Sequence, residues 1–206
     1  MNSPLSMPTG IYRTTLAVVD LDAITHNLRA LRSLLPGSVA ICAIVKANAY
    51  GHGAVPVSRE LEAHDVEAFG VATIEEGLEL RQAGIERPIL VLGVGFSGIE
   101  AAQEHRLAPV IYSPGMAERV SRAARRMKKP LSVHLKIDTG MGRLGLLGDE
   151  WKGVLEDLLE NPWIEVQGIA THFSSADSDA EFTRTQLARF KEAVDRAEGN
   201  RNSPVN

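Results

Sequence analysis

The sequence is poor in several features that define whole classes of protein. It has one cysteine, Cys42, so it can form neither an internal disulfide nor a multi-thiolate zinc site, which favours a reducing compartment such as the cytoplasm. Aromatic residues make up only 5%, and 22 basic residues face 26 acidic ones, so the chain lacks the basic surface that nucleic acids require. No apolar run reaches the length of a signal peptide or a membrane span. These shortages predict a cytoplasmic protein with no nucleic-acid partner and no membrane partner.

What is present is an ordinary globular composition, with 44% hydrophobic residues. Short apolar runs alternate with longer stretches whose apolar residues recur at helical spacing. The apolar runs predict strands at residues 39–46, 69–73, 89–93, 108–113, 131–138 and 165–172, with a further short strand at 15–19. The periodic stretches predict helices at residues 22–35, 53–64, 74–83, 98–105, 115–128, 150–160 and 180–197.

This alternation predicts the fold class. Strands that are apolar on nearly every position are buried on both faces, as in a parallel sheet covered by helices. We therefore expect an α/β protein with a parallel (β/α) barrel of the TIM type. Two more βα units would bring the chain to the ~250 residues typical of eight strands, so the barrel looks truncated to six of eight units. The expected boundaries are a disordered tail at 1–14, one barrel domain at 15–198 and a disordered tail at 199–206.

The first candidate site follows the strand at 39–46 and has the sequence VKANAYGHG at residues 45–53. Lys46 is the only charge on that strand, and the ends of barrel strands form the functional rim. A lysine there is suited to Schiff-base chemistry, although a lysine that extends into solvent is the alternative. Tyr50 adds a hydroxyl, and the glycines at 51 and 53 allow a ligand to approach the backbone closely.

The second candidate site has the sequence LSVHLKIDTGMGRLG at residues 131–145. Strict alternation directs Lys136 and Asp138 to the barrel interior, where polar groups need partners. Lys136 therefore should not stay an unpaired ammonium, and a carboxylate such as Asp138 could be its partner. The glycines around Arg143 form a loop that can present the guanidinium to a ligand oxygen.

Two further patterns follow predicted strands. His172 closes the strand at 165–172 on the same rim, where a lone histidine is more often structural than functional, and no metal site is expected because no second ligand lies at suitable spacing. Residues 93–98 match G-x-G-x-x-G, but the next strand ends without the acid that a dinucleotide ribose needs, so we interpret them as an ordinary loop.

These motifs together resemble one family. Residues 45–53 resemble the pyridoxal phosphate lysine motif of bacterial alanine racemases, and residues 136–145 (KIDTGMGRLG) resemble their second signature. The VDLDAI stretch at 19–24 and THF at 171–173 are also similar to that family. The resemblance therefore extends from about residue 15 to residue 198.

The resemblance implies a homodimeric enzyme that interconverts L- and D-alanine for peptidoglycan, with pyridoxal 5′-phosphate as cofactor. Lys46 would form the internal aldimine and act as one of two opposed bases. Tyr50 would bind the cofactor phosphate, and Arg143 would bind the phenolic oxygen and help to hold the substrate. His172 would pack against the pyridine ring, and Lys136 would be the lysine that is often carbamylated and orients the arginine.

The sequence also departs from the family. The tyrosine base, the arginine that faces the pyridine nitrogen, and the C-terminal β-domain come from beyond the part that this chain matches. We therefore expect an N-terminal fragment with little activity alone. Two alternatives are a non-catalytic pyridoxal phosphate homeostasis barrel, which suits a shorter chain but lacks the two long motifs, and an inert remnant.

Overall fold

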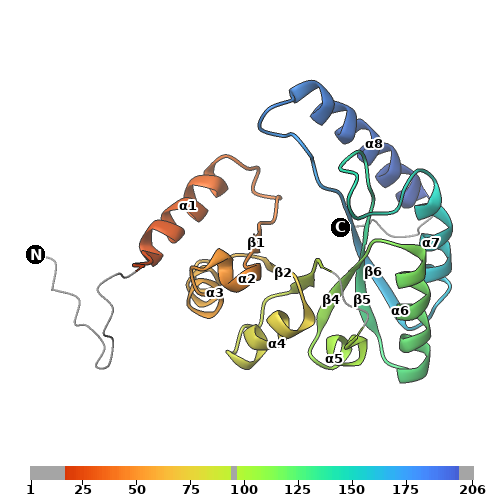
Figure 1. Ribbon diagram of the computed structural model, residues 1–206, viewed down its shortest axis with the longest axis horizontal. Helices are drawn as coiled ribbons and strands as arrows, with labels where there is room; N and C mark the ends of the chain where they lie inside the picture. The colour runs from red at the N-terminus through yellow and green to blue at the C-terminus, as the bar shows by residue number, and fades with distance from the viewer. Residues whose placement is uncertain (1–16, 94–96, 200–206) are drawn as a thin grey trace, which may run out of the picture.

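A six-stranded parallel sheet forms the centre of the chain in the computed structural model, which describes residues 17–93 and 97–199 (Figure 1). Neighbouring strands in the sheet are also neighbours in the sequence, in the order β1 to β6. The strands are β1 (Cys42–Ile44), β2 (Ala68–Val71), β3 (Ile89–Val91), β4 (Leu107–Ile111), β5 (Leu131–Lys136) and β6 (Ile164–Ala170). This confirms the predicted α/β class with six parallel strands, arranged as in part of a barrel.

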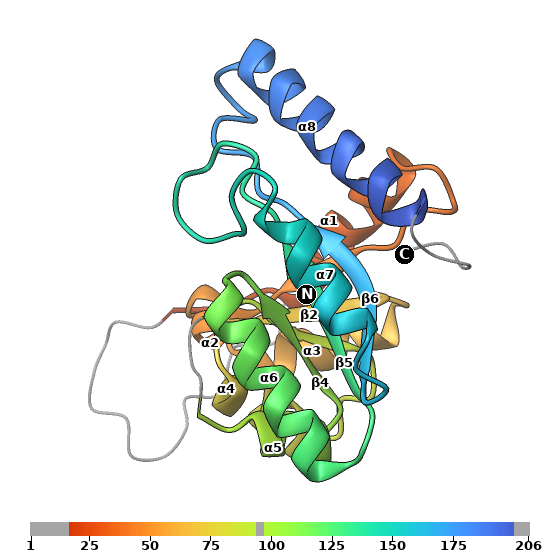
Figure 2. The same ribbon diagram turned by 90° about the vertical axis from the view of Figure 1, so that its right-hand side faces the viewer.

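Every helix predicted from periodicity is present. The helices are α1 (Leu21–Ser33), the short α2 (Lys46–Tyr50), α3 (Ala54–Ala63), α4 (Ile74–Gln82), α5 (Ile99–Glu104), α6 (Pro114–Met127), α7 (Glu150–Leu159) and α8 (Ala180–Gly199). Asp20, Thr73 and Ser113 cap the starts of α1, α4 and α6 by accepting backbone N–H bonds. Helices α6 and α7 cover the outer side of β4 to β6 (Figure 2). Among the described residues, no helix combines the length and apolarity needed to cross a membrane.

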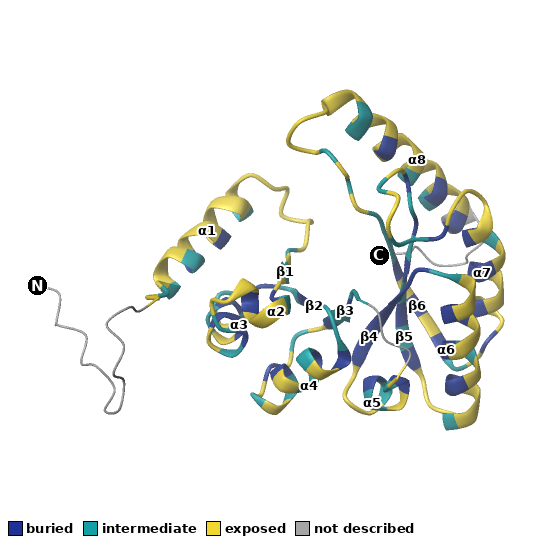
Figure 3. Cartoon of the chain, viewed as in Figure 1, coloured by how far each residue is buried: buried dark blue, intermediate teal, exposed yellow. Residues whose placement is uncertain are grey.

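The core lies between the sheet and these helices in two clusters, one around β1 to β3 and one around β4 to β6 (Figure 3). Strand β5 shows how the sequence produces this layering. Leu131, Val133 and Leu135 are at most 2% exposed on its helix-facing side, whereas His134 and Lys136 on the other side are only partly buried. The predicted alternation along β5 is therefore confirmed, and the polar side chains of this strand lie on the inner face of the sheet.

Some predicted boundaries were wrong. The strand predicted at 39–46 is reduced to Cys42–Ile44, because the chain leaves extended geometry at Val45, where φ is −118° and ψ is 18°. The strand predicted at 15–19 is not formed over residues 17–19, and Val18 is 69% exposed with no described strand beside it. The predicted tail at 1–14, residues 200–206 and the centre of the G-x-G-x-x-G loop at 94–96 lie outside the described residues.

Candidate active site

The backbone turns left-handed directly after β1. Ala47, Asn48, Ala49 and Tyr50 all have φ between 51° and 54°, and together with Lys46 they form α2. Residues with a Cβ rarely adopt this conformation, and each instance costs on the order of 1–3 kcal/mol. Four in succession persist only if the surrounding structure holds them in place.

Two polar side chains fix this left-handed turn by hydrogen bonds. Glu76 of α4 accepts the backbone N–H of Ala47 at 2.8 Å on one carboxylate oxygen and that of Ala72 at 2.6 Å on the other. The Asn48 side-chain oxygen accepts the N–H of Ala54 at the start of α3, at 2.7 Å. Glu76 therefore ties together the loops that follow β1 and β2, and Asn48 ties the turn to α3.

The turn places Lys46 and Tyr50 on the same side of the backbone. The Nζ atom of Lys46 lies 5.9 Å from the centroid of the Tyr50 ring, within the range of a cation–π contact. Tyr50 is 61% exposed, so its side chain remains available to a ligand.

Lys136, the last residue of β5, lies in a positive environment. Burial lowers the pKa of its ammonium, and the charges of Arg143 and Lys46 lower it further, while Asp138 opposes them. Among the described residues Lys136 forms no ion pair. The predicted pairing of Lys136 with Asp138 is therefore not formed, because the strand ends at Lys136 and the Asp138 carboxylate binds the backbone of its own loop instead.

His172 follows β6 on the same rim. Burial lowers the pKa of its imidazole, and the charges of Lys136, Arg143 and Lys46 lower it further. Its carbonyl accepts a 3.2 Å bond from the side-chain amide of Gln186, a fully buried residue of α8. Gln186 was not singled out by the sequence analysis, although a polar residue at a core-facing position of a helix was a signal that could have found it.

These side chains meet at a cavity of about 430 Å³ at the carboxyl ends of the strands. It is lined by Ile44, Lys46, Tyr50, Ala72, Leu92, Gly93, Val110, Lys136, Arg143, Leu144, Ala170, Thr171 and His172. The structure thus brings together all five residues that the sequence analysis proposed for a site. Three of them are cations, and within the described part of the chain no carboxylate lines the cavity. Such a cavity favours an anionic ligand.

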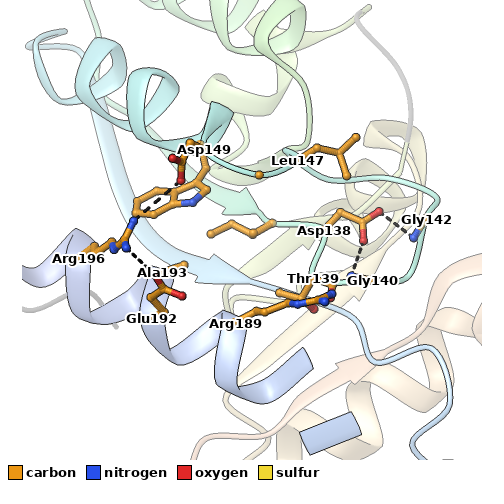
Figure 4. A pocket seen from close by; sticks show the side chains of 13 residues that line it. Asp138, Thr139, Gly140, Gly142, Leu147, Asp149, Arg189, Glu192, Ala193 and Arg196 are labelled. Carbon is orange, nitrogen blue, oxygen red and sulfur yellow. Dashed lines mark hydrogen bonds and ion pairs between the residues drawn. The ribbon is translucent and has the colours of Figure 1, made fainter. Parts of the chain in front are cut away.

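A second cavity, of about 480 Å³, lies between α7, α8 and the loop after β5 (Figure 4). Its charges are matched locally: Arg196 pairs with Glu192 at 2.5 Å and approaches Asp149 at 3.9 Å, and Arg189 donates to the Thr139 carbonyl at 2.9 Å. No lysine or histidine lines it within the described ranges. The cavity around Lys46 is therefore the candidate active site.

Comparison with known proteins identifies the family of the chain. The family described as "Alanine racemase, N-terminal domain" matches residues 19–206. The chain belongs to the alanine racemase family. It is 41% identical over 191 residues to an alanine racemase of Geobacter sulfurreducens, covering 88% of this chain and 49% of the relative. It is 44% identical over 179 residues to that of Syntrophobacter fumaroxidans, covering 85% and 48%.

Solved alanine racemase structures have the same fold. The structure from Streptomyces coelicolor A3(2) matches with a TM-score of 0.84 and 36% identity, covering 90% of this chain and 50% of that one. The structure from Clostridium difficile 630 matches with a TM-score of 0.81 and 33% identity, covering 90% and 51%. The chain therefore spans about half the length of the alanine racemases it matches. The alternative of a non-catalytic carrier barrel gains no support from these relatives.

Proposed function

We propose that this chain supplies the pyridoxal phosphate lysine and its surroundings to an alanine racemase active site. In this proposal Lys46 holds the cofactor and acts as one of two bases that interconvert L- and D-alanine, and the D-alanine serves peptidoglycan synthesis. The observation that supports it most is the cavity itself, where Lys46, Lys136 and Arg143 converge without a lining carboxylate in the described residues. Membership in the alanine racemase family supports the reaction type.

The residues present fit pyridoxal 5′-phosphate. The cofactor carries a phosphate, a phenolic oxygen and an aldehyde, and the cavity offers cations, an exposed tyrosine and a primary amine. When bound, the cofactor supplies an electron sink for the negative charge left at Cα after proton removal. Tyr50 would bind the phosphate and Arg143 the phenolic oxygen, while His172 would pack against the ring.

Each side chain then has one physical task. Lys46 removes or returns the Cα proton on one face of the substrate, as a positioned base. Arg143 presents a fixed set of N–H donors to the cofactor and to the substrate, as Arg does for planar oxyanions. Lys136 orients Arg143, which requires that Lys136 not repel it as a second cation. We also propose a cytoplasmic location, a homodimer as the working assembly, and a barrel domain spanning residues 15–198.

The proposal predicts selectivity for the phosphate form of the cofactor. Equilibrium dialysis should show that pyridoxal 5′-phosphate binds at least about 10-fold more tightly than pyridoxal, because only the phosphate offers charged oxygens to which the Tyr50 hydroxyl can donate. Tyr50→Phe should reduce this preference for the phosphate form, whereas the exposed Arg122→Ala on α6 should leave it unchanged. Equal affinity for the two compounds would contradict the proposal.

Lys136 is predicted to take up carbon dioxide. The neutral amine attacks carbon dioxide, an N–C bond forms, and the nitrogen loses a proton to solvent, so that a cation becomes an anion beside Arg143. Burial and the neighbouring cations lower the pKa of Lys136, so the neutral amine should be available at a lower pH than for an ordinary lysine near 10.4. With ¹³C-bicarbonate, a carbamate NMR signal should appear and should vanish in Lys136→Ala but not in Lys191→Ala. A signal unaffected by Lys136→Ala would refute this.

A further inference from the structure

The loop between Lys136 and Leu146 is closed at its base. Asp138 donates its N–H to the Leu146 carbonyl at 3.0 Å, and Leu146 donates its N–H to the Lys136 carbonyl at 2.9 Å. Ile137 and Leu146 pair as an isolated parallel bridge, and they are 4% and 0% exposed. The two ends of the loop are therefore fixed in the core, whereas the residues between them need further contacts to hold one conformation.

A single carboxylate fills that interior. One oxygen of Asp138 accepts the N–H groups of Gly140 and Met141, both at 2.8 Å, and the other accepts those of Gly142 at 2.8 Å and Arg143 at 3.2 Å. Figure 4 shows the bonds to Gly140 and Gly142. Partial burial raises the pKa of this carboxyl, but the four N–H groups outweigh it and the pKa lies below its ordinary value. The loop is thus folded around a negative charge.

The glycines of the loop make room for this arrangement. At Gly145, where φ is 143°, a Cβ would lie 2.5 Å from the backbone nitrogen of Asp138 and 2.9 Å from its Cβ. At Gly142, φ is 71°, a value that side-chain-bearing residues rarely adopt. The glycine spacing after Asp138 therefore permits the backbone to wrap around the carboxylate.

Arg143 is the last donor in this set. Its backbone N–H is held by the same carboxylate that holds Gly142, while its side chain lines the cavity with Lys136 and His172. We propose that Asp138 is a positioning residue for Arg143, which acts by folding the loop of residues 140–143 around its carboxylate and so aims the guanidinium into the cavity. This inference rests on the proposed function, because it assigns Asp138 a task in holding the cofactor through Arg143.

The first test needs no cofactor. Asp138→Asn keeps the size of the side chain but removes the charge and turns one acceptor into an NH₂ group that repels two backbone donors. Hydrogen exchange at the amides of residues 140–143 should accelerate by about 10-fold or more relative to the rest of the chain. The exposed Asp177→Asn is the matched control and should change none of these rates. Unchanged exchange in Asp138→Asn would overturn the proposal.

The second test separates positioning from a general structural role. Asp138→Asn should lower the affinity for pyridoxal 5′-phosphate about as much as Arg143→Ala, and the double variant should be no weaker than Arg143→Ala alone. A loss in the double variant equal to the product of the two single losses would overturn the proposal, as would unchanged affinity in Asp138→Asn. If the wild-type chain binds no pyridoxal phosphate, the proposed function fails, and the exchange rates alone decide whether Asp138 folds the loop.

A wild-type measurement covers the case in which Asp138→Asn does not fold. The pKa of the Asp138 carboxyl lies below its ordinary value. As the pH falls through that pKa, the amide NMR signals of residues 140–143 and the side-chain Nε–H signal of Arg143 should shift together. One shared midpoint supports the proposal. An Arg143 side-chain signal that does not shift at this midpoint would overturn the proposal.

Discussion

The 206-residue chain alone is expected to racemise L-alanine at least about 10²-fold more slowly than the same chain mixed with a polypeptide that supplies the unmatched half of a relative. Racemisation removes a proton from one face of Cα and returns one to the opposite face, so it needs a base on each side. Lys46 is proposed as one base. The resemblance places the other, a tyrosine, in the half of the enzyme that this chain does not match.

A coupled assay for D-alanine with excess pyridoxal 5′-phosphate measures this difference. The added polypeptide can be the corresponding half of the Geobacter sulfurreducens relative, which is 41% identical to this chain over the matched part. Lys46→Ala should abolish the restored activity, whereas the exposed Lys191→Ala should leave it intact. Full activity of the chain alone would show that one half suffices and that the two-base proposal is wrong.

Lys46→Ala is expected to reduce covalent capture of pyridoxal phosphate by on the order of 10²-fold or more, to the level of surface lysines. If the cavity binds the phosphate as proposed, the effective concentration of the aldehyde at Lys46 should greatly exceed that at any exposed lysine. Absorbance of the bound cofactor at neutral pH measures the capture.

Two controls make this result specific. Lys191→Ala removes an exposed lysine of α8 and should leave capture unchanged. Lys136→Ala removes the other lysine of the cavity and should preserve capture. The affinity of this variant for pyridoxal phosphate can still change, because Lys136 is proposed to orient Arg143. If Lys136→Ala abolishes capture and Lys46→Ala does not, the two lysines have been assigned in the wrong order.

The strands and helices could be predicted because their signals are local. Each strand corresponds to a short apolar run, because strands covered by helices bury apolar side chains. Each helix corresponds to a stretch with apolar residues at helical spacing, because only one of its faces is buried. Caps such as Ser113 before Pro114 marked helix starts in the same way. The five site residues could be predicted to meet because the carboxyl ends of parallel strands share one rim.

The features that were missed depend on contacts between distant segments. Nothing local predicts positive φ at Ala47, Ala49 and Tyr50, since that conformation is held by Glu76 from α4. Glu76 follows Thr73 at the spacing of an ordinary capping box. That local pattern accounts for a glutamate at this position, so the sequence does not indicate its hydrogen bond to the loop after β1. Asp138 was predicted to face the barrel interior because alternation was extended two residues past the end of β5.

Reduction of the cofactor-loaded chain with borohydride, followed by peptide mapping by mass spectrometry, tests the central claim most directly. Borohydride fixes the pyridoxyl group to the nitrogen that holds it, so the modified peptide names the lysine. The account predicts a stoichiometric pyridoxyl group on Lys46. A label on Lys136, or one spread over exposed lysines such as Lys191, would contradict it.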